Sequence, residues 1–371
     1  MGTSPLSLKK HFGTLRDPRL RRRRRHQLLD IVAIAVCAVI GNANTWPDIV
    51  TFAKSHRTWL KRFLALPNGI PSHDTFERVF DRLEPAAFAR CFSSWTAFLF
   101  ENLGLKQIAI DGKTLRGSRK DGLGALHMVS AWASENHLSL GQVAVNEKSN
   151  EITAIPRLLE LLDLKGALVT IDAMSCQKDI ARKIVDGGGD YLLTVKSNQE
   201  TLLNDLQDAF EKALETNFAG LDHDTYETNQ YAHGRLERRL YTVIQDPQGL
   251  SQAEAWAKLS VIGMCCSEKN ISGKVSTEVR FFIGSKKAKA RFYGKALRNH
   301  WGIENGLHWQ LDVSFHEDRN RTQKRHAAEN LSCLRRLALT LLKKHTSKES
   351  IARKRYRASM DEIFLEEVLQ G

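Results

Sequence analysis

Three acidic side chains have the setting that a metal site for phosphate chemistry requires. Asp111 and Asp172 each close a short apolar run, KQIAID and ALVTID, and Glu304 lies much later in a long helical pattern. Carboxylate oxygens are the ligands that Mg²⁺ and Mn²⁺ prefer. Two such ions, roughly 3.5–4 Å apart, can activate an attacking oxygen and stabilise the leaving one. Acids that follow strands also cap helices and begin turns, so the residue types alone leave catalytic and structural interpretations open.

The polar residues around Glu304 recur at helical spacing. His300, His308 and Asp312 stand in steps of four residues with Glu304, so a continuous helix would carry all of them on one face. This face can lie beside the metal ions or a DNA phosphate, or it can form a buried polar seam. A zinc hydrolase built on His300, Glu304 and His308 would leave both aspartates without a role, and we disfavour it.

The elements that must position the aspartates lie between residues 105 and 214. Strands are predicted over 106–111, 127–133, 138–145, 167–172 and 190–195, and helices over 152–162, 177–185 and 199–214. Three opening strands can form a meander, whereas the later strands need crossover helices. The pattern therefore predicts an α/β fold with a mixed sheet and helices packed on it. Functional groups gather where strands end at the carboxyl edge of such sheets, and both aspartates are expected there.

The other regions flank this first part of the core. Residues 1–100 are predicted to form a helical, basic N-terminal domain, with an arginine run before an apolar helix that starts near Leu28. Such helices can bind DNA, although a purely structural bundle has the same pattern. Residues 215–285 are predicted as a β-rich insertion, residues 286–345 as the second part of the core, and residues 346–371 as a basic tail.

Two helices are expected in the second part of the core. The first, over 293–312, carries Glu304, and the second, over 325–344, has a leucine-rich apolar face. The basic residues of the second helix, Arg335 and Arg336 among them, are expected on a solvated face.

Composition excludes several classes of protein. The 371 residues are 42% hydrophobic, which supports a folded core, and the net charge of +13 favours a polyanionic partner. Six cysteines form no Cys-x-x-Cys pair, which supports neither a zinc module nor a disulfide framework and fits a reducing cytoplasm. The longest apolar run, over residues 31–41, is too short to span a bilayer, so we expect no membrane partner.

Several local sequences resemble one family. Asp111-Gly112-Lys113 and the string HWGIENGLHWQLDVSFHEDR over residues 300–319 resemble insertion-sequence transposases of the DDE type, and among them the H-repeat-associated proteins linked to Rhs elements. The resemblance covers nearly the whole chain and includes RLRRRRRHQLLDIVAIAVCAVI, VTIDAMSCQK, TVKSNQ and HGRLERR. The string at 300–319 is long and specific.

This resemblance implies a ribonuclease-H-like catalytic core, with which the order of strands and helices agrees. It implies that Asp111, Asp172 and Glu304 are the catalytic, metal-binding acids and that two Mg²⁺ or Mn²⁺ ions are the cofactor. The implied reaction is hydrolysis at the ends of the element, which frees 3′-hydroxyls, followed by attack of these hydroxyls on target DNA. The implied partner is double-stranded DNA, bound by a homodimer.

The sequence departs from a signature that related transposases often carry around the glutamate. That signature is Tyr, Arg, Glu, Lys, but here His300 falls where the arginine usually lies and Leu311 falls near the lysine position. The hairpin chemistry associated with the signature is therefore in question.

Basic residues near the predicted strand ends and in the arginine run are candidates for DNA contact. They are Arg21, Arg22, Arg23, Arg24, Arg25, Lys113, Lys196, Arg235, Arg238 and Arg298. The alternative for each is an exposed charge on a solvated surface. Trp301 and Trp309 can stack on an unpaired base, but tryptophans on helices more often belong to the core, and we expect core positions.

The leading hypothesis is an active DNA transposase. The nearest alternative is a metal-dependent nuclease of the same fold that cleaves without joining. The second alternative is a domesticated, non-catalytic DNA-binding protein, for which loss of an acid would be the expected mark, yet all three acids are present.

Overall fold

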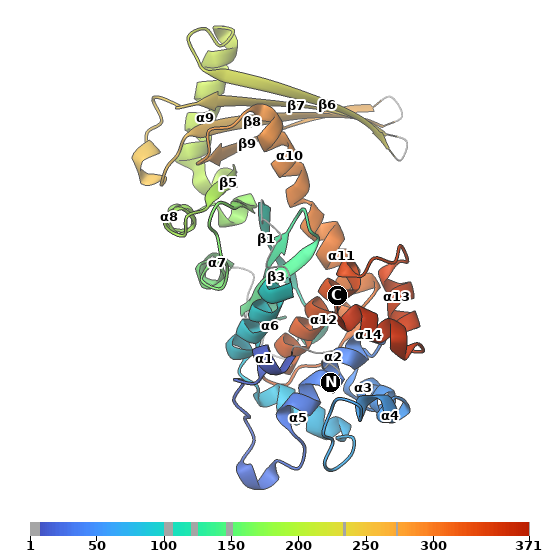
Figure 1. Cartoon of the computed structure of the whole chain (residues 1–371). Helices are drawn as coiled ribbons and strands as arrows, with labels where there is room; N and C mark the ends of the chain where they lie inside the picture. The colour runs from blue at the N-terminus through green and yellow to red at the C-terminus, as the bar shows by residue number, and fades with distance from the viewer. Residues whose placement is uncertain are drawn as a thin grey trace.

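The computed structural model describes residues 8–99, 107–119, 125–145, 151–232, 235–271 and 274–370. Within these residues the strands form one nine-stranded sheet in the order β3-β2-β1-β4-β5-β9-β8-β7-β6. Figure 1 shows β6–β9 with α9 and α10 at one end of the molecule and the N-terminal helices with α12–α14 at the other. β1 and β3 lie between these two ends.

The first five strands match the predicted positions, and four more lie in the segment predicted to be β-rich. They are β1 Gln107–Thr114, β2 His127–Ala133, β3 Leu138–Val145, β4 Leu168–Ile171, β5 Asp190–Val195, β6 His223–Ala232, β7 Arg235–Gln245, β8 Val261–Ile271 and β9 Lys274–Gly284. β1, β2 and β3 form an antiparallel meander, and β4 and β5 run parallel to β1. The predicted α/β fold with a mixed sheet and helices packed on it is confirmed.

The helices cover the sheet and fill the end of the molecule opposite β6–β9. They are α1 Leu8–Phe12, α2 Leu28–Ile40, α3 Trp46–Ser55, α4 Arg57–Leu60, α5 His73–Arg82, α6 Pro85–Leu99, α7 Glu151–Leu159, α8 Lys178–Asp186, α9 Glu200–Glu215, α10 Ala290–His300, α11 Trp309–Val313, α12 Ala327–Lys344, α13 Ile351–Ala358 and α14 Glu362–Gln370. A π-helical segment, Glu304–His308, lies between α10 and α11. Helices α7 and α8 supply the connections that the parallel strands need.

The β-rich residues after α9 extend the core sheet. β9 pairs antiparallel with β5, from Leu192 opposite Gly284 to Val195 opposite Phe281. β8, β7 and β6 then follow as an antiparallel meander. The segment predicted as an insertion therefore continues the hydrogen-bonded ladder of the core, and its strands share the sheet that carries the aspartates.

The first hundred residues and the end of the chain share one hydrophobic core. α2 is buried on nearly every side, from Asp30 to Ile40, and it packs against α12 and α14. The residues predicted as a tail form α13 and α14, and α14 buries Phe364, Leu365 and Val368 in the same core. The first and the last described helices, α1 and α14, both pack on α2 in this helical body (Figure 1).

Charged side chains inside this body correct the prediction of a solvated basic face. Arg335 and Arg336 are 3% and 0% exposed, and Arg336 Nη1 lies 3.3 Å from Oε1 of the buried Glu317. Arg355, also buried, donates hydrogen bonds to the carbonyl oxygens of Val39 and Ala43. Buried guanidinium groups require such partners, and these join distant segments of the chain.

No helix among the described residues is long and apolar enough to cross a membrane.

Candidate active site

Asp111 lies at the point where β1 parts from β4. The parallel pairing of the two strands ends at Ile110 opposite Ile171, whereas β1 continues beside β2 as far as Thr114. Asp111 is therefore inside β1, and the expectation that it ends its strand holds only for the pairing with β4. Its Oδ1 accepts a hydrogen bond of 2.8 Å from the Gly112 backbone N–H.

Asp172 directly follows β4, as predicted. Its Oδ1 accepts a hydrogen bond of 2.7 Å from the Ala173 backbone N–H, which begins a short 3₁₀ turn. The Thr194 hydroxyl, on β5, donates to the same oxygen at 3.2 Å. The adjacent parallel strands β1 and β4 thus place both aspartates at one edge of the sheet.

Glu304 begins the π-helical segment, so the prediction of a regular helix over 293–312 is wrong at this point. The wider turn adds a residue, a feature that is frequent at functional sites. Gly306 within it packs on the indole of Trp132, where a Cβ atom would lie 2.7 Å from Trp132 Cζ2. A glycine is thus what allows the π-helical segment to approach β2 so closely.

The three acids line one cleft with a volume of about 1090 Å³. Asp111 and Asp172 come from the middle of the sheet, and Glu304 from the segment after α10. The sequence prediction of a converging set is therefore consistent with the geometry of the described residues.

The carboxyl groups interact electrostatically. Burial is the largest cause that raises the pKa of Asp111, and the charges of Glu151, Asp172 and Glu304 add to it in decreasing order of effect. Against the lowering effect of the Gly112 N–H, these causes together raise the pKa to about 7. Burial also acts to raise the pKa of Asp172, but the Ala173 N–H and the charge of Lys196 outweigh it and lower the pKa overall. Crowded carboxylates of this kind favour either a proton or a cation among them.

The donor set suits a hard divalent cation, because every candidate ligand is a carboxylate oxygen. In the part of the chain that the structure describes, no three acidic, histidine or cysteine side chains are close enough together to hold a metal ion as they stand. Binding would therefore require the acids to close in on the ion, and it would relieve the repulsion that raises the pKa of Asp111.

The two histidines occupy different sides of the site. His300 Nδ1 lies 2.9 Å from the Thr170 hydroxyl on β4, and His308 Nδ1 lies 3.5 Å from Asp111 Oδ2. Burial lowers the pKa of His300 to about 4 and that of His308 to about 3, so both imidazoles are neutral at pH 7. His300 is placed to orient Thr170, two residues before Asp172, by a hydrogen bond, whereas His308 lies beside the Asp111 carboxylate.

Asp312 and Lys113 belong to a separate ion-pair network. Lys113 is 8% exposed, and its Nζ lies 2.8 Å from Asp312 Oδ1 and 2.9 Å from Asp318 Oδ1. The geometry gives no support to a phosphate contact by Lys113, and its burial rules out the solvated alternative. It connects β1 to the chain that follows the Glu304 segment.

Of the basic residues predicted to touch DNA, Lys196 and Arg298 line the cleft. Arg239 and Arg280 line it as well. Arg238 points to the opposite face of β7 from Arg239 and pairs with Glu227 at 2.9 Å.

The arginine run lies in the helical body. Arg21, Arg22 and Arg25 are exposed, and Arg24 donates to the Arg19 carbonyl oxygen at 2.9 Å. The side chains of Arg23 and Arg235 fall outside the described residues.

Both tryptophans beside Glu304 are exposed, so the expectation of core positions is wrong. Trp301 is 50% and Trp309 53% exposed. Trp301 lines the cleft, and the Arg280 guanidinium lies 5.3 Å from the centre of its ring. An apolar ring of this size at the rim of a polar cleft is available to a ligand.

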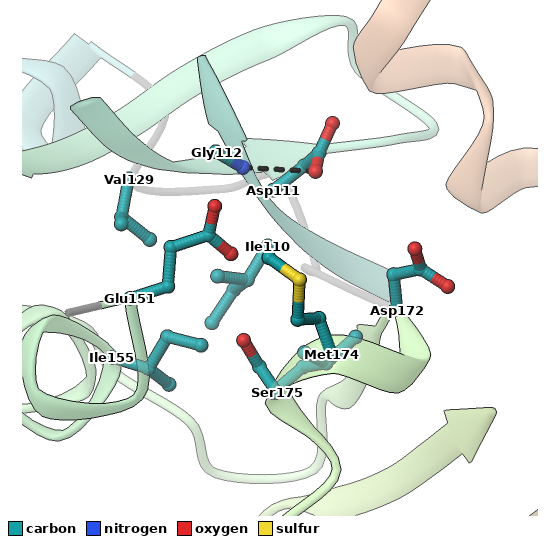
Figure 2. Close-up of a pocket in the computed structure, with 10 residues that line it drawn as sticks. Ile110, Asp111, Gly112, Val129, Glu151, Ile155, Asp172, Met174 and Ser175 are labelled. Atoms are coloured by element: carbon teal, nitrogen blue, oxygen red, sulfur yellow. Dashed lines mark hydrogen bonds between the residues drawn. The ribbon is translucent and has the colours of Figure 1, made fainter. Parts of the chain in front are cut away.

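Sequence reasoning missed a fourth acid. Glu151 lines a pocket of about 100 Å³ together with Asp111, Gly112 and Asp172 (Figure 2). Glu151 is the first residue of α7, where an acidic side chain commonly interacts with the helix dipole. The sequence therefore offered no reason to assign this glutamate to the site.

Comparison with known proteins identifies the family. Residues 103–341 match the family described as Transposase DDE domain, and residues 9–96 match the one described as DDE_Tnp_1-associated. The chain is 39% identical over 372 residues to the "H repeat-associated putative transposase YhhI" of Escherichia coli (strain K12), covering 98% of each chain. This chain belongs to the DDE transposase family.

Two further matches accompany this one. The chain is 41% identical over 370 residues to "Putative transposase YncI" of Escherichia coli O157:H7, covering 98% of this chain and 94% of that one. Among solved structures, the piggyBac transposase synaptic complex with hairpin DNA matches with a TM-score of 0.41 and 9% identity, over 98% of this chain and 77% of that one. Membership of the DDE transposase family rests on the sequence matches.

Proposed function

We propose that this DDE transposase cuts DNA at the ends of its element and joins the freed 3′-hydroxyls to target DNA, with Asp111, Asp172 and Glu304 as the acids that hold two Mg²⁺ or Mn²⁺ ions. The observation that carries the proposal is the convergence of these three acids, from segments far apart in the chain, on one cleft that basic side chains also line. Family membership supports the same reaction class.

The chemistry consists of two phosphoryl transfers. In the first, water attacks the phosphorus at the element end, the bond to the 3′-oxygen breaks, and a 3′-hydroxyl leaves. In the second, this hydroxyl attacks a target phosphorus, and the target strand's 3′-oxygen leaves. Bound Mg²⁺ or Mn²⁺ supplies Lewis-acid stabilisation of the attacking and leaving oxygens.

The side chains of the protein prepare the site for these steps. The Ala173 N–H and Lys196 keep Asp172 ionised, so it is ready to ligate a cation. Asp111 gives up its proton near pH 7. His308, neutral and 3.5 Å from Asp111 Oδ2, limits the positions that this carboxylate can take.

The cleft also supports a path for DNA. Lys196 and Arg298 supply positive charge along it, while Arg239 and Arg280 are paired with Glu237 and Glu278 of the same lining. Trp301 at its rim is exposed enough to stack on an unpaired base at a cut end. The exposed arginines of the run in the helical body are available for the backbone of flanking duplex.

A test uses purified protein, Mg²⁺ and labelled duplexes that end in the element's inverted repeats, followed by addition of target plasmid. We expect nicks at the ends and joined products, both lost without the metal and with Asp172→Asn. Cleavage without joined product would assign a nuclease, binding without cleavage a non-catalytic DNA-binding protein. Equal cleavage by wild type and Asp172→Asn would refute the assignment of the site.

Two further parts of the proposal concern the setting of the reaction. Transposition acts on two element ends together, so we propose a homodimer on DNA. We place the protein in the cytoplasm, where it meets the bacterial chromosome. Size-exclusion chromatography with light scattering, with and without paired ends, tests the first point.

A further inference from the structure

Glu151 lies beside Gly112, the residue that follows the first aspartate of the site, although the reaction outlined above does not use it. It opens α7, is 9% exposed, and lines the same small pocket as Asp111 and Asp172. Figure 2 shows its carboxylate directed from α7 toward the Asp111–Gly112 segment. An acidic side chain whose only role is to interact with a helix dipole is normally exposed to solvent. The Glu151 side chain is instead directed inward, into a pocket that other carboxylates line.

A buried histidine holds Glu151 in this position. His127, on β2, is 1% exposed, and its Nε2 lies 2.5 Å from Glu151 Oε1. The other ring nitrogen, Nδ1, lies 2.9 Å from the Thr114 hydroxyl on β1. The contact of His127 Nε2 with Glu151 is short, but its geometry is not that of a hydrogen bond.

The backbone beside Asp111 is shaped to admit this pair. Gly112 follows Asp111, and a Cβ atom at Gly112 would collide with both His127 Nε2 and Glu151 Oε1. Residue 112 must therefore be glycine for Glu151 to approach Asp111 from the α7 side. Gly112 on β1, His127 on β2 and Glu151 on α7 thus meet at one point of the structure.

Burial of a carboxylate against other carboxylates is costly unless a cation compensates for it. His127 contacts Glu151 Oε1, and the pocket that Glu151 lines is lined by Asp111 and Asp172 as well. The pocket of about 100 Å³ has room for a small ion or a few waters.

We propose that Glu151 is a fourth carboxylate of the metal site, which shares with Asp111 a divalent cation on the α7 side and is held in place by His127. The inference rests on the proposed function, because it assumes that Asp111 binds a cation. It assigns to Glu151 a role as a ligand and to His127 and Gly112 the role of positioning it.

The test measures Mn²⁺ binding to the full chain by isothermal titration calorimetry, without DNA. The variants are Glu151→Gln, Asp111→Asn and Asp172→Asn, and the matched control is Glu329→Gln, a partly buried glutamate on α12 outside both pockets. We expect Glu151→Gln to weaken Mn²⁺ binding by about tenfold or more. We expect Glu329→Gln to bind Mn²⁺ as the wild type does, with Mg²⁺ raising its melting temperature equally.

The outcomes separate the inference from the function on which it rests. Mn²⁺ binding by Glu151→Gln that equals that of wild type, while Asp111→Asn and Asp172→Asn weaken it, overturns the role of Glu151 and leaves the aspartate site intact. Unchanged binding in all of these variants overturns the metal site as well.

A second variant guards against misfolding of Glu151→Gln, which circular dichroism would reveal. Glu151→Asp keeps the charge but draws the carboxylate back by one methylene. We expect its Mn²⁺ affinity to fall between those of the wild type and Glu151→Gln. An affinity of Glu151→Asp equal to that of the wild type would argue against direct ligation.

Discussion

Replacement of Asp111 with asparagine should stabilise the metal-free protein at alkaline pH, even though it removes a proposed catalytic residue. Burial and three neighbouring carboxylates raise the pKa of Asp111 from its ordinary value near 3.8 to about 7. The folded state therefore binds this proton more tightly than the unfolded chain does. Stability contributed by the protonated group is complete below about pH 4 and is lost as the pH rises through about 7.

The magnitude follows from the two pKa values. A pKa difference of this size corresponds to about 4 kcal/mol for a fully buried group. The Asp111 side chain is 34% exposed, so solvent screens its charge and we expect roughly half of that, about 2 kcal/mol. The amide of the Asp111→Asn variant has no charge to bury, so the variant does not lose this stability.

The assay is urea unfolding of wild type and Asp111→Asn in EDTA at pH 4, 6 and 8. We expect equal free energies of unfolding at pH 4 and an advantage of about 2 kcal/mol for the variant at pH 8. Addition of Mg²⁺ at pH 8 should reverse the order, because only the wild type gains binding energy from the ion. A variant less stable than wild type at pH 8 in EDTA, or an advantage that does not change with pH, would refute the reasoning.

Three further predictions concern the cleft and the segment that carries Glu304. Asp172→Asn should lower Mg²⁺-dependent nicking at least ~100-fold, because one metal ligand is lost. Its DNA affinity in a gel-shift assay should stay within about twofold of the wild type, because the basic side chains of the cleft remain. Loss of DNA binding by this variant would contradict the prediction. Gly306→Ala should destabilise the fold by about 1–3 kcal/mol in urea, because its Cβ would press on Trp132. Gly302→Ala, whose Cβ would meet nothing within 4 Å, serves as its control and should unfold close to the wild type. Trp301→Ala should weaken binding of a duplex with an unpaired end base by about 1–3 kcal/mol and leave a fully paired duplex nearly unaffected, as measured by fluorescence anisotropy; an equal loss on both DNAs would exclude stacking.

The sheet and the aspartates were predictable because their signals are local. Each core strand is a short apolar run bounded by turn residues, and alternation with helices implies parallel neighbours. Asp172 follows such a run directly, and Asp111 sits where β1 leaves β4. The order of elements along the chain therefore sufficed to bring these two residues together.

The environment of Glu304 was not predictable from periodicity. A spacing of four residues in the sequence is the same in an α-helix and in a chain that contains a π-helical turn. The close approach of Gly306 to Trp132 on a distant strand is a contact that this spacing does not report. The exposure of Trp301 likewise depends on which side of α10 the sheet occupies. Such contacts join residues far apart in sequence, and no local pattern reports them.

Ion pairs between residues far apart in the sequence also explain why the environments of Lys113 and Arg336 were predicted wrongly. Lys113 looks like a phosphate ligand beside an acid, but Asp312 and Asp318 enclose it after some two hundred intervening residues. Arg336 looks like a surface residue of a basic helix, but the buried Glu317 compensates it. A buried charge needs a partner, and the sequence does not say which residue it is.

The helical body has a consequence for catalysis beyond any contact that its arginines make with DNA. The apolar side of the Glu304 segment, Ile303, Leu307 and Leu311, is buried in the same core as α2 and α12. The position of the third acid therefore depends on packing against the first hundred residues, whereas the two aspartates depend on the sheet. Both parts meet at Trp132, which belongs to β2 and also packs in the helical core. A change in this packing moves Glu304 relative to Asp111 and Asp172, so the N-terminal helices are part of the structure that sets the geometry of the site.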